Sequence, residues 1–203
     1  MLVAFSDVHL TDGTAFPSNL SADAVEKVLL EALISVLDRR PQVREVRVAV
    51  LGDLFDLVRT RRWWEIKGGE WAERAVTPWS SGDERTLEEE AHGVMGEILE
   101  RNRPFVQALR ELPEKLLEEY PRLEQAELVY VVGNHDRLVG QLPSLRRLAQ
   151  EELEAEVLWG RAYEPEGYEL TASHGHQFDL VNRPDRGLPP LGDFIASLIT
   201  ALP

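Results

Sequence analysis

Short β-rich apolar runs alternate with longer amphipathic segments along this chain, and the alternation predicts an α/β fold. The β-rich runs cover residues 2–5, 46–51, 128–132, 156–159 and 168–172. Apolar residues between 25 and 36 recur at helical spacing, so we expect a helix there that Ser21 caps and Pro41 ends. Another helix is expected at 144–154. A last helix should carry its apolar residues on one side: Phe194, Ile195, Leu198, Ile199 and Leu202.

The segment from 58 to 121 is rich in Trp, Arg and Glu and helical in period, and we expect a helical insertion or cap there. Pro104 and Pro113 are predicted to break its helices. Four of the five tryptophans lie near three arginines in this segment: Trp63, Trp64, Trp71 and Trp79 with Arg59, Arg61 and Arg62. They could form aromatic walls and phosphate-binding groups over a cleft, or the tryptophans could simply pack the inserted helices on the core.

Composition narrows the classes of function. The 203 residues suit one domain with an insertion, and 36 acidic against 22 basic residues give a net charge of -14. That charge disfavours nucleic acid as a partner, and with it a nuclease, because phosphate backbones are bound by massed Lys and Arg. The absence of cysteine excludes disulfides and thiolate metal sites. Because we find no signal-peptide pattern and no membrane-spanning apolar run, we expect a cytoplasmic protein.

Side chains that can carry chemistry gather where the β-rich runs end. They form four sets: Asp7 and His9, Asp53 and Asp56, Gly133-Asn134-His135-Asp136, and His174 with His176. Ligands of α/β folds gather beyond the carboxyl ends of strands, so these sets could meet at one edge of a sheet. Carboxylates, imidazoles and an amide without thiolate suit Mn, Fe, Zn or similar divalent ions. Their number exceeds what one ion needs and suggests a site for two.

Spacing gives some of these residues specific tasks. Asp7 and His9, two apart on extended backbone, should project to the same side and could ligate one ion. Gly52 would let the chain turn tightly before Asp53, whose two oxygens could bridge both ions. Asn134 could bind through its carbonyl oxygen without adding charge.

Three ordered motifs, Asp7-x-His9, Gly52-Asp53-x-x-Asp56 and Gly133-Asn134-His135-Asp136, resemble the calcineurin-like metallophosphoesterase family. Residues 173–179 are similar to a segment of relatives of the UDP-2,3-diacylglucosamine hydrolases. The resemblance implies a β-sandwich core flanked by helices (α/β/β/α). It also implies that residues 1–203 belong to one domain, with 58–121 as a helical insertion within it.

The resemblance further implies two divalent ions, Mn foremost, with Fe, Zn, Ni or Co as alternatives. Asp7 and His9 would hold the first ion and Asp53 would bridge both. Asn134 and His174 would hold the second ion.

The implied reaction is hydrolysis of a small phosphodiester, pyrophosphate or phosphomonoester. The ions would lower the pKa of a bridging water, whose hydroxide attacks phosphorus. His135, oriented by Asp56, would then protonate the leaving oxygen as general acid. Candidates for binding the substrate phosphate are Arg137, directly after the third motif, and Arg59, Arg61 and Arg62.

The sequence departs from the family pattern, which ends in Gly-His-x-His, because Phe178 stands where the second histidine is needed. We therefore interpret His174 as the family's isolated histidine and expect a domain incomplete at its C-terminal end, with each ion one ligand short. His176 and Asp136 could be further ligands or could hold a ligand in place. The alternative function is a degenerate or truncated family member that serves as a non-catalytic binding scaffold.

Exposed apolar surface would allow two further kinds of partner. An exposed apolar patch at the tryptophans or at the last helix could support peripheral contact with a membrane. The uncovered apolar side of the last helix could equally favour a homo-oligomer.

Overall fold

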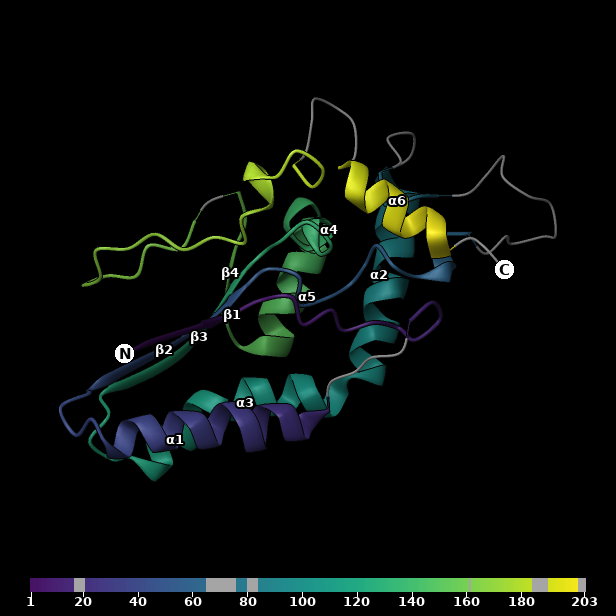
Figure 1. The fold of residues 1–203 in the computed structure, drawn as a ribbon. Coiled ribbons are helices and arrows are strands. Elements are labelled where there is room, and N and C mark those ends of the chain that lie inside the picture. Colours follow the sequence, from purple (N-terminus) through teal and green to yellow (C-terminus); the bar gives the residue numbers. More distant parts are fainter. Residues whose placement is uncertain (17–20, 65–75, 80–83, 161, 184–189, 201–203) are drawn as a thin grey trace.

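The computed structural model describes residues 1–203 except 17–20, 65–75, 80–83, 161, 184–189 and 201–203. Its centre is a sheet (Figure 1). The sheet has four parallel strands in the order β1-β2-β3-β4. The strands are β1 (Leu2–Phe5), β2 (Glu45–Leu51), β3 (Gln125–Val131) and β4 (Glu156–Leu158). In the register of the sheet, Val48 of β2 lies between Val3 and Leu128. The predicted α/β class is confirmed at this level.

Helices fill the connections, because parallel neighbours need a crossover longer than a hairpin turn. The first crossover holds the π-helical η1 (Ala24–Leu30) and α1 (Glu31–Asp38), and the second holds η2 (Arg61–Trp64), α2 (Glu84–Arg101) and α3 (Arg103–Glu119). The third holds α4 (Arg137–Gln141) and α5 (Pro143–Leu153), and η3 (His176–Phe178) and α6 (Leu191–Thr200) follow β4. The helices predicted for the first crossover, for 144–154 and for the last apolar segment are therefore present.

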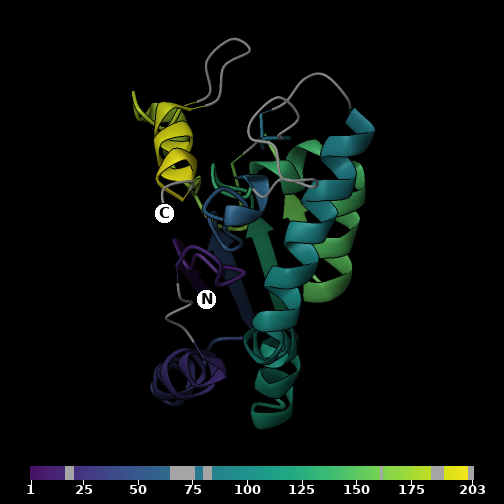
Figure 2. The same cartoon turned by 90° about the vertical axis from the view of Figure 1, so that its right-hand side faces the viewer.

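Helices lie along one face of the sheet (Figure 2). On this face the side chains of alternate strand residues form the main core together with side chains of the helices. The buried residues of this core include Val46, Val48, Val50, Leu128 and Tyr130 from the strands and Leu33, Leu37, Leu109, Leu112, Leu116 and Leu145 from the helices. The opposite face carries a smaller cluster of Ala49, Val129, Val131, Leu158 and Tyr163. The sheet is thus covered by helices on one side and by the segment around Tyr163 on the other.

The strand predicted at 168–172 is wrong. Of these residues only Ala172 pairs, in an isolated antiparallel bridge with Tyr163. A turn in which the Tyr168 N–H donates to the Pro165 carbonyl at 3.2 Å folds the segment back on itself, so its pairing is local. Within the described ranges this face therefore carries a bridge rather than a second sheet, and the α/β/β/α sandwich stays a prediction.

The two prolines of the region 58–121 behave differently. Pro104 lies in the first turn of α3, where its missing N–H costs nothing, and the predicted break before it is confirmed. Pro113 lies inside α3 without ending it, so the second predicted break is wrong. The helix continues because Leu109, Leu112 and Leu116 on either side of Pro113 are buried in the core.

The helices of this region do not form a separate layer. α3 packs against β3 and η1, and its apolar face belongs to the main core. The definition of 58–121 as an insertion or cap stays a prediction. None of the helices in the described part of the chain has the length and apolar character needed to cross a membrane.

Candidate functional site

The loops that follow β1 and β2 pair with each other beyond the carboxyl ends of these strands. The His9 N–H donates to the carbonyl of Asp53 at 2.8 Å, and Leu10 and Phe55 form a parallel bridge. Asp7, His9 and Asp53 all have a left-handed backbone, with φ of 59°, 52° and 54°. The extended backbone expected for Asp7 and His9 is therefore wrong, because the chain turns sharply at both residues. Left-handed residues other than glycine are uncommon and cluster at functional sites.

Two glycines allow close approach of backbone and side chains at the site. Gly52 has a φ of 89°, and a Cβ placed on it would lie 2.5 Å from Cγ of His174. A Cβ on Gly133 would overlap the carboxylate of Asp53. Glycine is needed at both positions because a side chain would displace the functional group beside it.

A first group of candidate metal ligands consists of Asp7, Asp53 and His174, whose ligand atoms lie within 4.8 Å of one another. Nδ1 of His174 donates to the Leu51 carbonyl at 2.8 Å, which turns Nε2 toward Oδ2 of Asp53, 3.3 Å away. The same Nε2 lies 3.0 Å from Oδ1 of Asn134. The structure thus brings four predicted ligands together from distant parts of the sequence.

Opposite charges hold this group together. Burial disfavours a charged Asp53, but its contacts with His174 and His135 outweigh burial and lower the pKa of its carboxyl. Burial also disfavours a charged His174, yet the hydrogen bond to Asp53 raises the pKa of that imidazole to about 9. Asp53 and His174 are therefore an ion pair at neutral pH.

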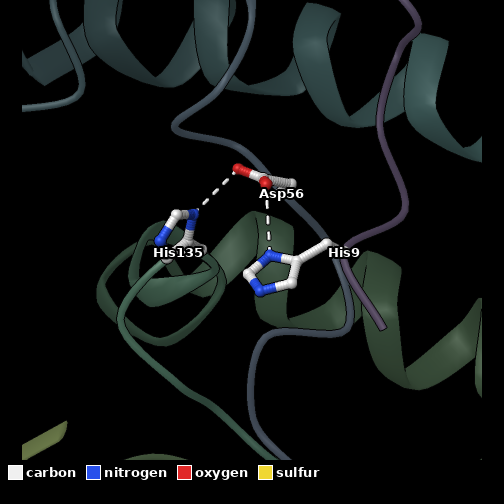
Figure 3. Close-up of side chains that lie close together, drawn as sticks. All are labelled: His9, Asp56 and His135. Carbon is white, nitrogen blue, oxygen red and sulfur yellow. Dashed lines mark hydrogen bonds and ion pairs between the residues drawn. The ribbon is translucent and has the colours of Figure 1, made fainter. Parts of the chain in front are cut away.

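The second group is Asp56 with His9 and His135 (Figure 3). The Asp56 side chain is fully buried, and it lies 3.1 Å from Nδ1 of His9 and 3.0 Å from Nδ1 of His135. The backbone N–H of Arg59 donates to the same carboxylate at 2.9 Å, and the Arg59 guanidinium donates as well. The contact expected between His135 and Asp56 is present.

These contacts set the charges of the second group. Burial favours a neutral Asp56, but the two imidazoles and Arg59 keep the pKa of its carboxyl well below the usual range. Burial favours a neutral His135, but Asp56 outweighs it and raises the pKa of the imidazole. Asp56 is therefore a buried anion that favours the protonated form of the His135 imidazole.

His9 of the second group also faces the first group. With Nδ1 on Asp56, its ring presents Nε2 to the opposite side. That atom lies 3.9 Å from an oxygen of Asp7 and 3.8 Å from an oxygen of Asp53. The ring of His9 also meets the ring of His135 edge to face, with centroids 4.8 Å apart. The carboxylate of Asp56 thus fixes both the candidate metal ligand His9 and the candidate acid His135.

The donors present fit a divalent cation. They are carboxylate, imidazole and amide atoms, which borderline to hard ions prefer. His176 lies beside them, its ring centroid 5.3 Å from that of His174. Its Nδ1 is buried and has no hydrogen-bond partner among the described residues. Because Nδ1 of His176 is shielded from water and unpaired next to His174, this nitrogen could serve as a further metal ligand.

Asp136 connects the loops instead of facing the first group. It is fully buried and accepts backbone N–H groups of Leu54 at 2.8 Å and Gly133 at 2.6 Å. The hydroxyl of Tyr130 donates to it as well. Burial and the nearby charge of Asp53 raise the pKa of Asp136 above its usual range. Asp136 therefore fixes the loop after β2 to the loop after β3.

Three of the four candidate phosphate-binding arginines have acidic partners. Arg137 is buried and donates Nε to Asp193 at 3.2 Å and Nη2 to the Pro78 carbonyl at 3.1 Å. Arg59 is bound to Asp56, and Arg62 pairs with Glu90 and Glu97. Arg61 lies on the surface.

The described tryptophans of the cluster pack against protein. Trp63 is buried and donates Nε1 to the Leu57 carbonyl at 2.6 Å. Trp64 donates Nε1 to the Ser197 carbonyl of α6 at 2.9 Å. Trp79 lies with its ring 5.4 Å from that of Phe194. Trp71 lies outside the described residues. These contacts favour the packing interpretation over an open aromatic wall.

Sequence reasoning missed one residue of the site. Asp193 of α6 is fully buried and accepts Nδ2 of Asn134 at 2.8 Å. A signal was present, since Asp193, Ser197 and Thr200 are spaced as one polar stripe along an otherwise apolar helix. All three side chains are buried.

Comparison of the chain with protein-family models, with curated proteins and with solved structures found no match. What the site can do is therefore inferred from its own residues. They form one group that could hold a cation and a second, hydrogen-bonded group of a carboxylate and two imidazoles, and His9 of the second group lies next to the first.

Proposed function

We propose that this chain is a metal-dependent phosphoesterase of the calcineurin-like type, acting on a small phosphodiester, pyrophosphate or phosphomonoester. The observation that carries the proposal is the position of His9. Its Nδ1 contacts Asp56, the partner of His135, while its Nε2 faces Asp7 and Asp53. A cation site and a proton donor that lie against each other are what hydrolysis at phosphorus requires.

Five residues would hold two divalent ions, with manganese as the first choice: Asp7, His9, Asp53, Asn134 and His174. When bound, such ions would neutralise charge on the phosphoryl oxygens and make a nucleophilic water available near neutral pH. The residues supply two carboxylates, one of them buried at 3% exposure, so the site attracts cations. Asn134 contributes an oxygen without further negative charge, which leaves room for an anionic substrate.

His135 would donate the proton that the leaving oxygen needs. Asp56 holds Nδ1, so Nε2 is the nitrogen left to face a substrate. The backbone N–H of His135 donates to Oδ1 of Asp53 at 2.9 Å, which fixes the residue against the cation-binding group. His135 would therefore keep a fixed position relative to Asp53 and to an ion bound there.

The test is His135→Ala, assayed with manganese on two aryl phosphodiesters that differ in leaving group. With phenolate as the leaving group we expect kcat to fall by about 10²–10⁴-fold, because an acid contributes by protonating that oxygen. With 4-nitrophenolate, which needs little protonation, the loss should be much smaller. Metal content should stay unchanged.

His92→Ala is the matched control, because His92 lies on α2 and not at the strand ends. It should retain turnover of both substrates. Equal losses for the two leaving groups in His135→Ala would show that His135 positions other groups or binds metal instead of acting as the acid.

One observation favours a second candidate, the non-catalytic scaffold. The ion pair of Asp53 with His174, closed by Asn134, satisfies these groups without a cation. A scaffold of this kind should take up no manganese in a calorimetric titration of the whole chain. Manganese binding at the site would remove this candidate.

A further inference from the structure

α6 is oriented with its polar side toward the protein. Asp193, Ser197 and Thr200 are buried, whereas Ile195 and Ile199 are 44% and 52% exposed. The helix is therefore held largely by polar contacts. The Thr200 hydroxyl donates to the Thr60 carbonyl at 3.1 Å, and the Ser197 carbonyl accepts Nε1 of Trp64.

Asp193 is the member of this stripe that reaches the candidate site. Its Oδ1 accepts Nδ2 of Asn134 at 2.8 Å, and its Oδ2 accepts Nε of Arg137 at 3.2 Å. Arg137 is anchored in turn on the Pro78 carbonyl at 3.1 Å. A fully buried carboxylate with two such partners has a single well-defined position.

This contact decides which way the Asn134 amide points. A carboxamide has one donor end and one acceptor end. A carboxylate can only accept, so it binds the Nδ2 end and excludes the flipped amide. The carbonyl Oδ1 is then turned to the opposite side, where it lies 3.0 Å from Nε2 of His174.

We propose that Asp193 is a positioning residue, which fixes the Asn134 carbonyl oxygen in the cation-binding group and makes α6 part of the site. The inference rests on the proposed function in so far as the task of that oxygen is to bind a metal ion. Residues that orient metal ligands typically contribute about 10–100-fold to metal affinity.

The test is a double-mutant cycle on manganese affinity, measured by calorimetry on the full chain. Asp193→Ala should weaken manganese binding by about 10–100-fold. Asn134→Ala should also weaken it. Because Asp193 acts through Asn134, the double variant should bind no more weakly than Asn134→Ala alone. Independent, multiplying losses, or an unchanged affinity in Asp193→Ala, would overturn the proposal.

Two controls separate positioning from structural roles. Ser197→Ala removes a buried hydroxyl from the same face of α6, where Oγ has no hydrogen-bond partner among the described residues, and should leave manganese affinity unchanged. Arg137→Met removes the other partner of Asp193. If it weakens manganese binding as much as Asp193→Ala does, then the Arg137 ion pair and not the Asn134 contact is responsible, and the proposal is wrong.

A readout without metal keeps this inference separate from the proposed function. In nuclear magnetic resonance of asparagine-labelled protein, the side-chain NH₂ of Asn134 should be protected from exchange in the wild type. Protection should be lost in Asp193→Ala and kept in Asp193→Asn, whose amide oxygen can still accept. If the wild type binds no manganese, the proposed function fails while this readout still decides the positioning. Equal protection in Asp193→Ala and the wild type would overturn it.

Discussion

At the scale of single residues, the site depends on buried charges that its neighbours compensate. Asp56 has no solvent exposure, and a buried carboxylate is stable only when hydrogen bonds and opposite charges replace its lost hydration. His9, His135 and Arg59 supply these contacts. Removing one partner would therefore disturb the others, because all of them share one anion.

Gly52 offers a test of close packing at this scale. We expect Gly52→Ala to lower the free energy of unfolding by about 1–3 kcal/mol, because alanine disfavours the left-handed backbone at φ 89°. The new Cβ would also displace His174, so manganese affinity should fall. Urea unfolding and calorimetric titration measure the two effects.

Gly167→Ala is the matched control. Gly167 has a similar φ of 81°, but a Cβ there meets nothing within 4 Å. It should show a comparable loss of stability and unchanged manganese affinity. The packing argument is contradicted if both variants bind manganese equally well.

The sequence located most of the candidate site because its residues follow strands, and strand ends meet in a parallel sheet. Two features could not be predicted in this way. The contact of His9 with Asp56 spans 47 positions and depends on how two loops join. Asp193 lies on α6, which was predicted from its apolar residues alone. That the polar side of this helix is the buried one depends on how the helix packs in the fold.

At the scale of elements, four of the five predicted strands are present, because continuous apolar runs mark strands that are buried in the sheet. β1 coincides with its predicted run, β2 and β4 differ from theirs by one residue, and β3 begins three residues earlier than predicted. Prediction failed where tertiary packing overrode local signals, as at Pro113, which α3 tolerates because its leucines are buried. It failed again at 168–172, because a strand needs a neighbouring edge, which a local pattern does not specify.

The junction of α1 and α3 gives a pH-dependent prediction. The Tyr120 hydroxyl, at the end of α3, donates to Asp38 at 2.7 Å and to the Ile34 carbonyl at 3.2 Å. Burial and the charge of Asp38 raise the pKa of Tyr120 to about 12. Below pH 10 the wild type should exceed Tyr120→Phe in free energy of unfolding by about 1.5–3 kcal/mol, the range for a hydrogen bond to a charged group.

The difference between the two proteins should shrink between pH 10 and pH 12. In that window unfolded tyrosine loses its proton while folded Tyr120 retains it, so folding binds protons and weakens as pH rises. Urea unfolding at a series of pH values gives the difference, and Tyr168→Phe controls for loss of a hydroxyl elsewhere. A difference that stays constant up to pH 12 would contradict the assignment.

At the scale of the whole molecule, the candidate site joins distant parts of the chain. Asp7 follows β1, Asp53 follows β2 and Asn134 follows β3, while Asp193 ties α6 to the same place. An ion held there would contact loops that separate on unfolding. Its binding free energy should therefore add to the stability of the entire fold.

This coupling gives the last prediction. With manganese at about 100 times its dissociation constant, the wild type should gain about 2.7 kcal/mol, which corresponds to a rise of about 5–10 °C in melting temperature for a chain of this size. Asp53→Asn should melt lower without metal, because it loses the ion pair with His174, and should gain much less from manganese. Asp23→Asn, which removes an exposed carboxylate that pairs with Lys27, controls for the change in charge. Scanning calorimetry with and without manganese measures all three proteins. An equal shift in Asp53→Asn and the wild type would place the ion elsewhere, and no shift in the wild type would favour the scaffold.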